Sequence, residues 1–215
     1  MSDALTNPSP PAWPNRERFL AFLRFLFWFY LAFFPVYFGA GAIAAHSGRA
    51  MTLFFAWERE IPLIPWMIWP YLSVFPLFLL PLFHLNPQEI ARLSRQSTLT
   101  ILIAGLIFVL LPMRRGFATF SVDGFYRPAF DLLGSVDTPH NLAPSLHVAF
   151  GALILLVCAE RTTPNWARLY FLLFAVLSAS TVLVHQHHVV DIATGAALAI
   201  FVRRIAPIKA SLINN

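Results

Sequence analysis

Long apolar runs dominate this sequence and restrict the folds open to it. The first run covers residues 19–45 and contains one charged residue, Arg24. It is longer than the roughly 20 residues with which an α-helix crosses a bilayer. Only 12% of the 215 residues are charged and 58% are hydrophobic, whereas an ordinary soluble domain has roughly 25% charged residues. These features predict an integral membrane protein.

Six apolar runs are present in all, so we expect an all-α bundle of six transmembrane helices. The second run contains five prolines, which neighbouring membrane helices can accommodate, and it is expected to be kinked. The fourth and sixth runs are short for a crossing and need the polar residues at their starts to gain length. The runs cover residues 19–45, 61–85, 98–113, 145–159, 167–184 and 189–202.

One membrane domain is expected over residues 18–206, between two cytoplasmic tails at 1–17 and 207–215. The first tail is predicted to be disordered because it is rich in proline and has little apolar surface to bury. A cleaved signal peptide is an alternative interpretation of the first run, since Ala42-Ile43-Ala44 resembles a cleavage site. The apolar region of a signal peptide, however, covers only about 7 to 15 residues.

Basic residues predict the orientation in the membrane. The net charge of +5 does not indicate a nucleic-acid partner, because the basic residues are few and scattered among apolar runs. A cytoplasmic N-terminus gives ten basic residues on the inner side: Arg16, Arg18, Arg24, Arg92, Arg95, Arg161, Arg168, Arg203, Arg204 and Lys209. The outer side then has Arg49, Arg59, Arg114, Arg115 and Arg127. The positive-inside rule therefore predicts a multi-pass protein of the cell (inner) membrane with both termini in the cytoplasm.

Histidines from two helical hairpins meet on the outer side of this topology. Ser145 and His147 lie at the outer end of the fourth run, and His187 lies in the turn before the sixth. Asp191 follows His187 by four residues, so on a helix its carboxylate can hold the imidazole in one tautomer. One histidine can then attack phosphorus while the other moves a proton.

Three arginines on the same side, Arg114, Arg115 and Arg127, match the needs of a phosphate site. A guanidinium group binds phosphate oxygens with paired hydrogen bonds. Together with the histidines, these arginines predict a phosphoryl-transfer site. Alternatively, Arg114 and Arg115 anchor a helix end at the membrane interface, a common role of arginine.

At these residues the sequence resembles the phosphatidic acid phosphatase type 2 (PAP2) superfamily. Pro144-Ser145-Leu146-His147 is similar to its PSxH motif, and residues 180–191 have the spacing of its SRxxxxxHxxxD motif. The match is greatest to the branch that includes inositol phosphorylceramide synthases. The resemblance implies the PAP2/acid phosphatase-like fold, with His187 as the nucleophile that becomes phosphohistidine and Asp191 orienting it. It further implies that His147 protonates the departing alcohol, that Ser145 helps to bind phosphate, and that neither a metal nor another cofactor takes part.

Two basic positions of the family motifs are occupied by uncharged residues. Thr181 stands where the second motif has arginine, and Phe120 stands where the KxxxxxxRP motif has lysine, although Arg127-Pro128 matches the end of that motif. Arg114 and Arg115 are the candidates to replace the missing charge. The remaining histidines of the turn, His185 and His188, have no family role and are interpreted as supporting or interfacial residues.

The predicted substrate is a lipid phosphate whose tails stay among the membrane lipids while its headgroup meets the histidines. If water accepts the phosphoryl group from the phosphohistidine, the protein is a phosphatase; if a lipid alcohol accepts it, the protein is a headgroup transferase. We favour the phosphatase because its chemistry is simpler. Two other hypotheses remain. One is a metal-dependent membrane oxidase, which is disfavoured because such sites need many histidines at repeated spacings, whereas the chain has 7 histidines with His46, His84 and His140 dispersed. The other is a non-catalytic transporter or scaffold with the same fold. The single cysteine, Cys158, excludes an internal disulfide and is interpreted as a packing residue. The oligomeric state is not predicted.

Overall fold

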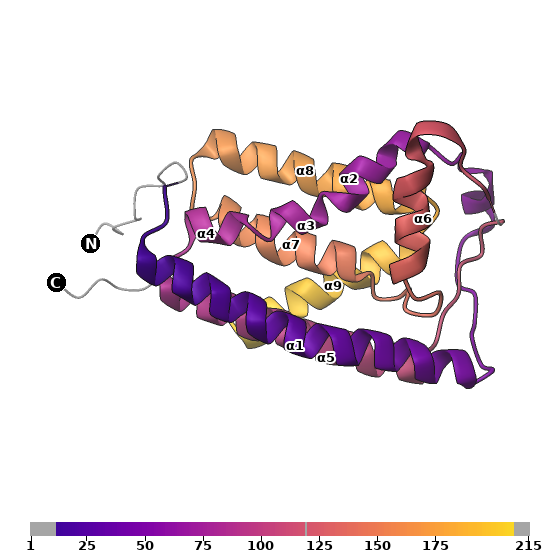
Figure 1. Cartoon of the computed structure of the whole chain (residues 1–215), viewed down its shortest axis with the longest axis horizontal. Coiled ribbons are helices and arrows are strands. Elements are labelled where there is room, and N and C mark those ends of the chain that lie inside the picture. Colours follow the sequence, from indigo (N-terminus) through magenta and orange to yellow (C-terminus); the bar gives the residue numbers. More distant parts are fainter. Residues whose placement is uncertain (1–11, 119, 209–215) are drawn as a thin grey trace.

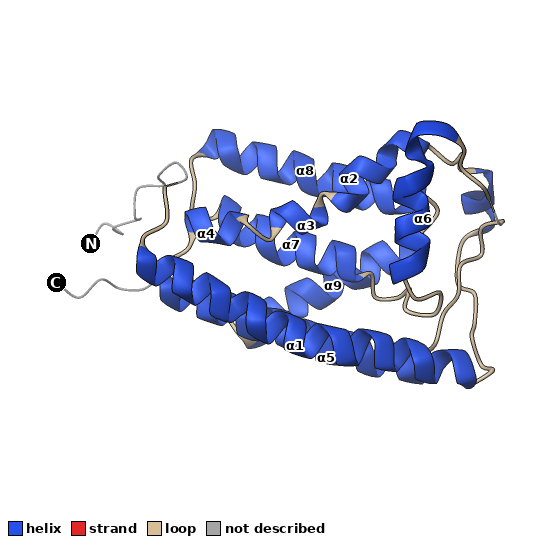
Figure 2. Cartoon of the chain, viewed as in Figure 1, coloured by secondary structure: helices blue, strands red, loops and turns tan. Residues whose placement is uncertain are grey.

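The computed structural model describes residues 12–118 and 120–208, and this part of the chain is all-helical (Figures 1 and 2). The helices are α1 (Arg16–His46), α2 (Ile68–Leu72), α3 (Val74–Leu77), α4 (Leu80–His84), α5 (Pro87–Leu110), α6 (Arg127–Val136), α7 (Leu146–Ala159), α8 (Pro164–Leu183) and α9 (Val189–Ile205). Short 3-10 helices cover Ala56–Glu60, Pro65–Met67 and Gly124–Tyr126. The prediction of an all-α protein is confirmed.

The predicted tails fall largely outside the described residues, because 1–11 and 209–215 are not among them. Helix α1 begins at Arg16, two residues before the predicted start of the domain. Asn15 fixes this start, since its side-chain oxygen accepts a hydrogen bond from the Arg18 backbone N–H at 2.9 Å.

Three helices, α1, α5 and α8, are long and apolar enough to cross a membrane. Helices α7 and α9 have 14 and 17 residues, which gives them lengths of only about 21 and 26 Å. The structure is therefore compatible with a membrane protein, and the number of six crossings stays a prediction.

The second apolar run is broken into the short helices α2, α3 and α4, as its prolines led us to expect. Pro70, Pro76 and Pro81 lie within these helices. Each proline lacks an N–H group and its ring clashes with the carbonyl four residues earlier, so a continuous helix cannot form. The interrupted segment returns the chain from one end of the bundle to the other (Figure 1).

Helix α5 begins at Pro87, eleven residues before the apolar run that predicted it. Asn86 and Glu89 form a capping box: Asn86 Oδ1 accepts from the Glu89 N–H at 2.9 Å, and Glu89 Oε2 accepts from the Asn86 N–H at 3.0 Å. Arg161 pairs with the other carboxylate oxygen of Glu89 at 2.7 Å. The first turns of α5 are therefore polar, and hydropathy alone does not reveal them.

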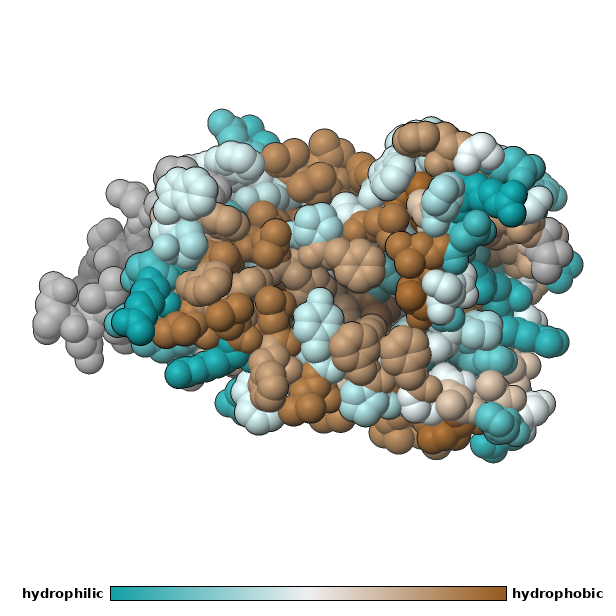
Figure 3. Space-filling view, viewed as in Figure 1, coloured by the Kyte–Doolittle hydropathy of each residue, from teal (hydrophilic) through white to brown (hydrophobic). Residues whose placement is uncertain are grey.

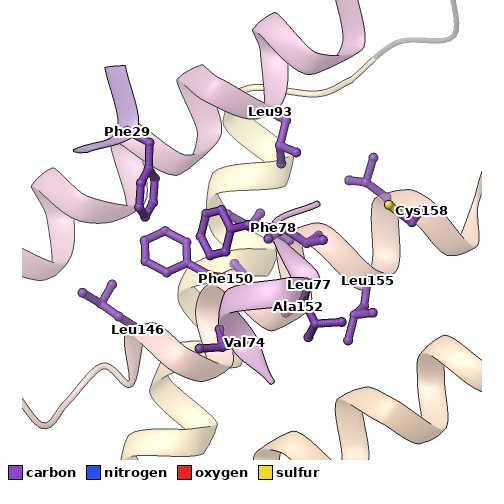
Figure 4. Close-up of a cluster of buried hydrophobic side chains, with 14 of the residues drawn as sticks. Phe29, Val74, Leu77, Phe78, Leu93, Leu146, Phe150, Ala152, Leu155 and Cys158 are labelled. Carbon is purple, nitrogen blue, oxygen red and sulfur yellow. The ribbon is translucent and has the colours of Figure 1, made fainter. Parts of the chain in front are cut away.

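Helix α7 is the central helix of the bundle. Twelve of its 14 residues are buried, and it contacts α3, α4, α5, α8 and α9. Figure 4 shows the aromatic centre of this core, where the Phe150 ring lies 5.1 Å from that of Phe29 and 5.6 Å from that of Phe78. Cys158 is a buried free thiol in the same core, which confirms its interpretation as a packing residue.

Helix α1 runs parallel to α5 along one side of the bundle (Figure 1). The two helices approach closely at Gly105, where an added Cβ would lie 2.2 Å from Val36 Cγ1. Helix α1 also exposes apolar side chains such as Phe27 and Phe34. In Figure 3 the face on view is mostly apolar across its middle and polar towards its ends, the pattern of a surface that meets lipid between two aqueous layers.

The bundle has two chemically different ends. Ion pairs tie together the end at which α5 and α8 begin: Glu89 with Arg161, and Glu160 with Arg203. Helices α7 and α9 begin at the other end, beside α6 (Figure 1). Helix α6 was not expected in the long polar loop. It buries Leu133 against Ile68, Tyr71 and Val184.

Candidate functional site

The structure brings His147 and His187 together at the end of the bundle where α7 and α9 begin. Their ring centroids are 6.0 Å apart. A backbone hydrogen bond joins the two segments, with the Ser145 N–H donating to the Asp191 carbonyl at 3.0 Å. An added Cβ at Gly195 would lie 2.5 Å from the Ser145 carbonyl oxygen, so α9 passes the start of α7 at backbone distance. This close packing fixes the spacing of the histidines.

Asp191, in the first turn of α9, orients His187, which lies just before the N-cap of that helix, His188. Its Oδ2 atom lies 3.3 Å from His187 Nδ1 and also accepts the His188 backbone N–H at 2.8 Å. The carboxylate is buried, and the His187 side chain is 8% exposed. Because Asp191 faces Nδ1, the opposite ring nitrogen, Nε2, is left for a ligand or substrate.

His147 lies against Tyr71, a residue of α2 that the sequence did not single out. The two rings stack with centroids 4.1 Å apart, and the tyrosine oxygen is 3.4 Å from His147 Nδ1. Tyr71 is 1% exposed. The contact is on the Nδ1 side of the His147 ring and does not involve the opposite nitrogen, Nε2. Tyr71 lies 76 residues from His147 in sequence, and no motif marks it.

Ser145, which was predicted to bind phosphate, also forms a hydrogen bond that caps a helix. It is fully buried and is the N-cap of α7, with its Oγ accepting the Val148 N–H at 3.4 Å. The N-termini of α7 and α9 thus lie side by side, and each presents the positive end of a helix dipole to the space around the histidines.

The three predicted arginines occupy different surroundings. Arg115 is partly buried and donates from Nη1 to Gln186 Oε1, next to His187 in the chain. Arg114 is exposed, and its backbone N–H donates to the Met51 carbonyl at 2.8 Å. Arg127 pairs with Asp131 along the exposed side of α6 at 3.5 Å, with 63% of its side chain exposed. In the described part of the chain, only Arg115 of the three contacts residues 185–188, the turn that contains His185, His187 and His188 and is called the histidine turn below.

The two uncharged positions noted in the sequence serve packing. Thr181 is fully buried at the end of α8, where its carbonyl accepts the backbone N–H groups of Gln186 at 3.0 Å and His187 at 2.9 Å. Phe120 contacts Phe130 and His185 edge to face. Thr181 therefore shapes the turn that carries His187.

A buried carboxylate, Glu58, is the main feature of the site that sequence reasoning missed. Its Oε2 accepts His188 Nδ1–H at 2.9 Å and the Val189 N–H at 3.0 Å, and its Oε1 accepts the Phe55 N–H at 2.9 Å. Glu58 is 0% exposed and His188 is 1% exposed. His188 Nε2 accepts the Gly116 N–H at 2.9 Å, so His188 is the neutral tautomer with its proton on Nδ1. The pair fastens the first loop to the start of α9.

Stacked rings extend this fastening across the end of the bundle. The Phe117 ring stacks on both His185 and His188, with ring centroids 4.1 and 4.4 Å apart. The Phe54 ring also stacks on His188, with centroids 5.0 Å apart. The Arg59 guanidinium lies 4.6 Å from the centroid of Phe54, a cation–π contact. Residues 54–59 and 115–117 therefore form a cover fixed to the histidine turn.

His185 is hydrogen-bonded to the segment that precedes α2. It has a positive φ of 57°, and its Nε2–H donates to the Ile61 carbonyl at 3.0 Å. Burial lowers the pKa of His185 below its ordinary value of 6.5, with a smaller contribution in the same direction from His188. The neutral imidazole is thus the stable form at neutral pH.

Comparison with protein-family models, curated proteins and solved structures found no match to the chain. In the described residues, no three side chains of histidine, cysteine, aspartate or glutamate are grouped so that they could hold a metal ion. The geometry of His147, His187 and Asp191 is therefore the basis for the chemistry of the site.

Proposed function

We propose that this chain is a membrane lipid-phosphate phosphatase of the PAP2 type, with six membrane-crossing segments, that works through a phosphohistidine. The observation that carries the proposal is the approach of His147 and His187 to 6.0 Å between ring centroids, with Asp191 on the Nδ1 side of His187. A nucleophile and a proton donor at this separation can flank one phosphate group.

In the first step, His187 Nε2 attacks phosphorus and the bond between phosphorus and the lipid oxygen breaks. His147 gives a proton to the departing alcohol. The Asp191 carboxylate accepts the Nδ1–H of His187 and stabilises the positive charge that develops on the ring. In the second step, water attacks the phosphohistidine, His147 takes a proton from that water, and cleavage of the N–P bond releases inorganic phosphate.

Arg115 is the best-placed cation for the phosphate oxygens. Its Nη1 is held by Gln186, and its remaining N–H groups can donate to an anion. The N-termini of α7 and α9 add favourable dipoles on the same side. In this proposal Arg114 and Arg127 do not contact the phosphate directly. Arg114 is exposed, and Arg127 pairs with Asp131.

The membrane placement follows from the basic residues. The end that contains Arg92, Arg95 and Arg203 faces the cytoplasm, and the histidines face the outer interface. A lipid phosphate reaches such a site by lateral diffusion, while its tails stay among the membrane lipids. A reporter fused after Asn215 tests this orientation: we expect it in the cytoplasm, and an external reporter would invert the proposal.

The function is tested by incubating the purified full chain, without added metal, with vesicles that contain phosphatidic acid, phosphatidylglycerophosphate, an isoprenoid diphosphate, or ceramide plus phosphoinositide. We expect phosphate release from at least one of these lipids and its loss in His187→Ala. His46→Gln is the matched control, because His46 is an exposed histidine at the end of α1. Unchanged turnover in His187→Ala would refute the nucleophile.

The same assay distinguishes the alternatives. A new phosphorylated lipid instead of free phosphate identifies a headgroup transferase, in which a lipid alcohol replaces water in the second step. Movement of lipid between leaflets without phosphate release identifies a non-catalytic transporter, and loss of turnover with a chelator identifies a metal enzyme.

A further inference from the structure

A groove between α1 and α5 lies at the end of the bundle opposite the histidines. Its volume is about 1150 Å³. From α1 it is lined by Arg24, Trp28 and Leu31, which share one helix face at spacings of four and three residues. From α5 it is lined by Arg95 and Thr98, among others. The groove is separate from the histidine site and does not depend on the proposed catalysis; it rests only on the proposed orientation in the membrane.

Polarity falls along this groove from its end towards the middle of the bundle. Arg24 and Arg95 each lie eight residues beyond the first residue of their helix, which places both about 12 Å from that end. Trp28 and Leu31 follow deeper along α1 and are 56% and 54% exposed. A headgroup contact above an apolar channel is the arrangement that fits a phospholipid.

Neither Arg24 nor Arg95 forms an ion pair with any carboxylate among the described residues. The one carboxylate on the groove, Glu17, lies seven residues before Arg24, about 10 Å away along the helix. Within residues 12–118 and 120–208, Arg24 thus has no carboxylate partner, and it lies on a helix whose apolar length can cross a membrane. Such a residue needs an anion, because an unpaired charge at membrane depth is costly.

The surroundings favour a lipid with net negative charge over a zwitterionic one. This end of the described chain contains nine arginines against three glutamates, and two of those glutamates, Glu89 and Glu160, are already paired. The arginines are Arg16, Arg18, Arg24, Arg92, Arg95, Arg161, Arg168, Arg203 and Arg204. Basic grooves between membrane helices on the cytoplasmic side bind anionic headgroups in this way.

We infer that the groove between α1 and α5 is a binding site for an anionic glycerophospholipid. Arg24 and Arg95 hold its phosphate, the hydroxyls of Ser94 and Thr98 lie beside it, and one acyl chain lies along Trp28 and Leu31. The bound lipid neutralises the guanidinium groups and fills the space between the two parallel helices.

Native mass spectrometry of the purified full chain with phosphatidylglycerol or phosphatidylethanolamine tests this site. We expect phosphatidylglycerol to bind more tightly, and Arg24→Gln with Arg95→Gln to weaken it by roughly tenfold or more, because charged hydrogen bonds are lost. Arg168→Gln is the matched control, since Arg168 is exposed at the same end and does not line the groove. It should bind like the unaltered chain.

Equal binding of phosphatidylglycerol by the double variant would overturn the site, and equal binding of the two lipids would overturn the preference for an anionic headgroup. A photoactivatable phosphatidylglycerol on the unaltered chain gives a second measurement that does not depend on how the variants fold. We expect its crosslinks within residues 17–32 and 87–99. Crosslinks confined to other helices would refute the inference.

Discussion

Replacing Glu58 by glutamine tests whether the first loop fixes the start of α9. The carboxylate accepts three N–H groups: His188 Nδ1–H and Val189 N–H on Oε2, and Phe55 N–H on Oε1. A glutamine with its oxygen in place of Oε2 keeps two of these bonds and turns its NH₂ group towards the N–H of Phe55. The variant therefore loses one part-buried hydrogen bond and weakens two.

The expected cost follows from these contacts. A buried donor left unsatisfied costs about 1–3 kcal/mol, and the two surviving bonds lose the part of their strength that comes from the charge. The total is roughly 3 kcal/mol, which for a chain of this size corresponds to a fall in Tm of roughly 6–12 °C.

Thermal unfolding of the detergent-solubilised full chain measures this change. Glu60→Gln is the matched control, because Glu60 is exposed in the same short helix, and surface substitutions of this kind stay within about 0.5 kcal/mol. A Glu58→Gln variant that melts within about 1 °C of the Glu60→Gln variant would show that Glu58 does not hold the cover to α9, and would refute the reasoning.

Three further predictions address single contacts. Gly195→Ala places a methyl group 2.5 Å from the Ser145 carbonyl oxygen and should lower stability by about 1–3 kcal/mol. Gly39→Ala should not, because the added carbon meets nothing within 4 Å beyond its own stretch of helix. Equal melting of the two variants would contradict the close approach of α9 to α7. Since the pKa of His185 is lowered in the folded protein, the unfolded chain takes up its proton first, and stability should fall as the pH drops below about 6.5. His185→Asn, which tolerates the positive φ, should reduce this loss between pH 7 and 5, and an unchanged acid profile would exclude His185 as its source. Asp191→Asn should reduce phosphate release by roughly 100-fold or more while His46→Gln does not, and full activity would remove Asp191 from the proposed mechanism.

The relation between His147, His187 and Asp191 could be predicted because local rules determine it. A spacing of four residues brings Asp191 within reach of His187, although His187 lies just before the N-cap of α9, His188, and not within the helix as the spacing had suggested. Alternation of apolar runs brings both histidines to one end. The proline-rich second run likewise predicts its own interruption, because the missing N–H group is a property of each proline.

The pairing of Glu58 with His188 could not be predicted, because it joins residues 130 positions apart through loops without periodic patterns. Glu58 stands in the charged string Glu58-Arg59-Glu60, which is typical of an exposed loop, and only the packed structure separates the buried member from its exposed neighbours. The start of α5 was missed for a related reason. Its capping box is a local signal, but the polar first turns lack the hydropathy on which the membrane runs were identified.

The unequal lengths of the helices have a consequence for the membrane around the protein. Helix α1 has 31 residues and α7 has 14, so they extend about 46 and 21 Å, against a hydrocarbon core of about 30 Å. With the proposed orientation, α1 must tilt or protrude. Helix α7 is surrounded by other helices and is shorter than the hydrocarbon core, so either the bilayer around the bundle thins or His147 lies recessed below the headgroups. The distance from a lipid phosphate to the histidines thus varies with bilayer thickness. Lipids with short acyl chains should bring the headgroup closer to His147, and lipids with long acyl chains should hold it away.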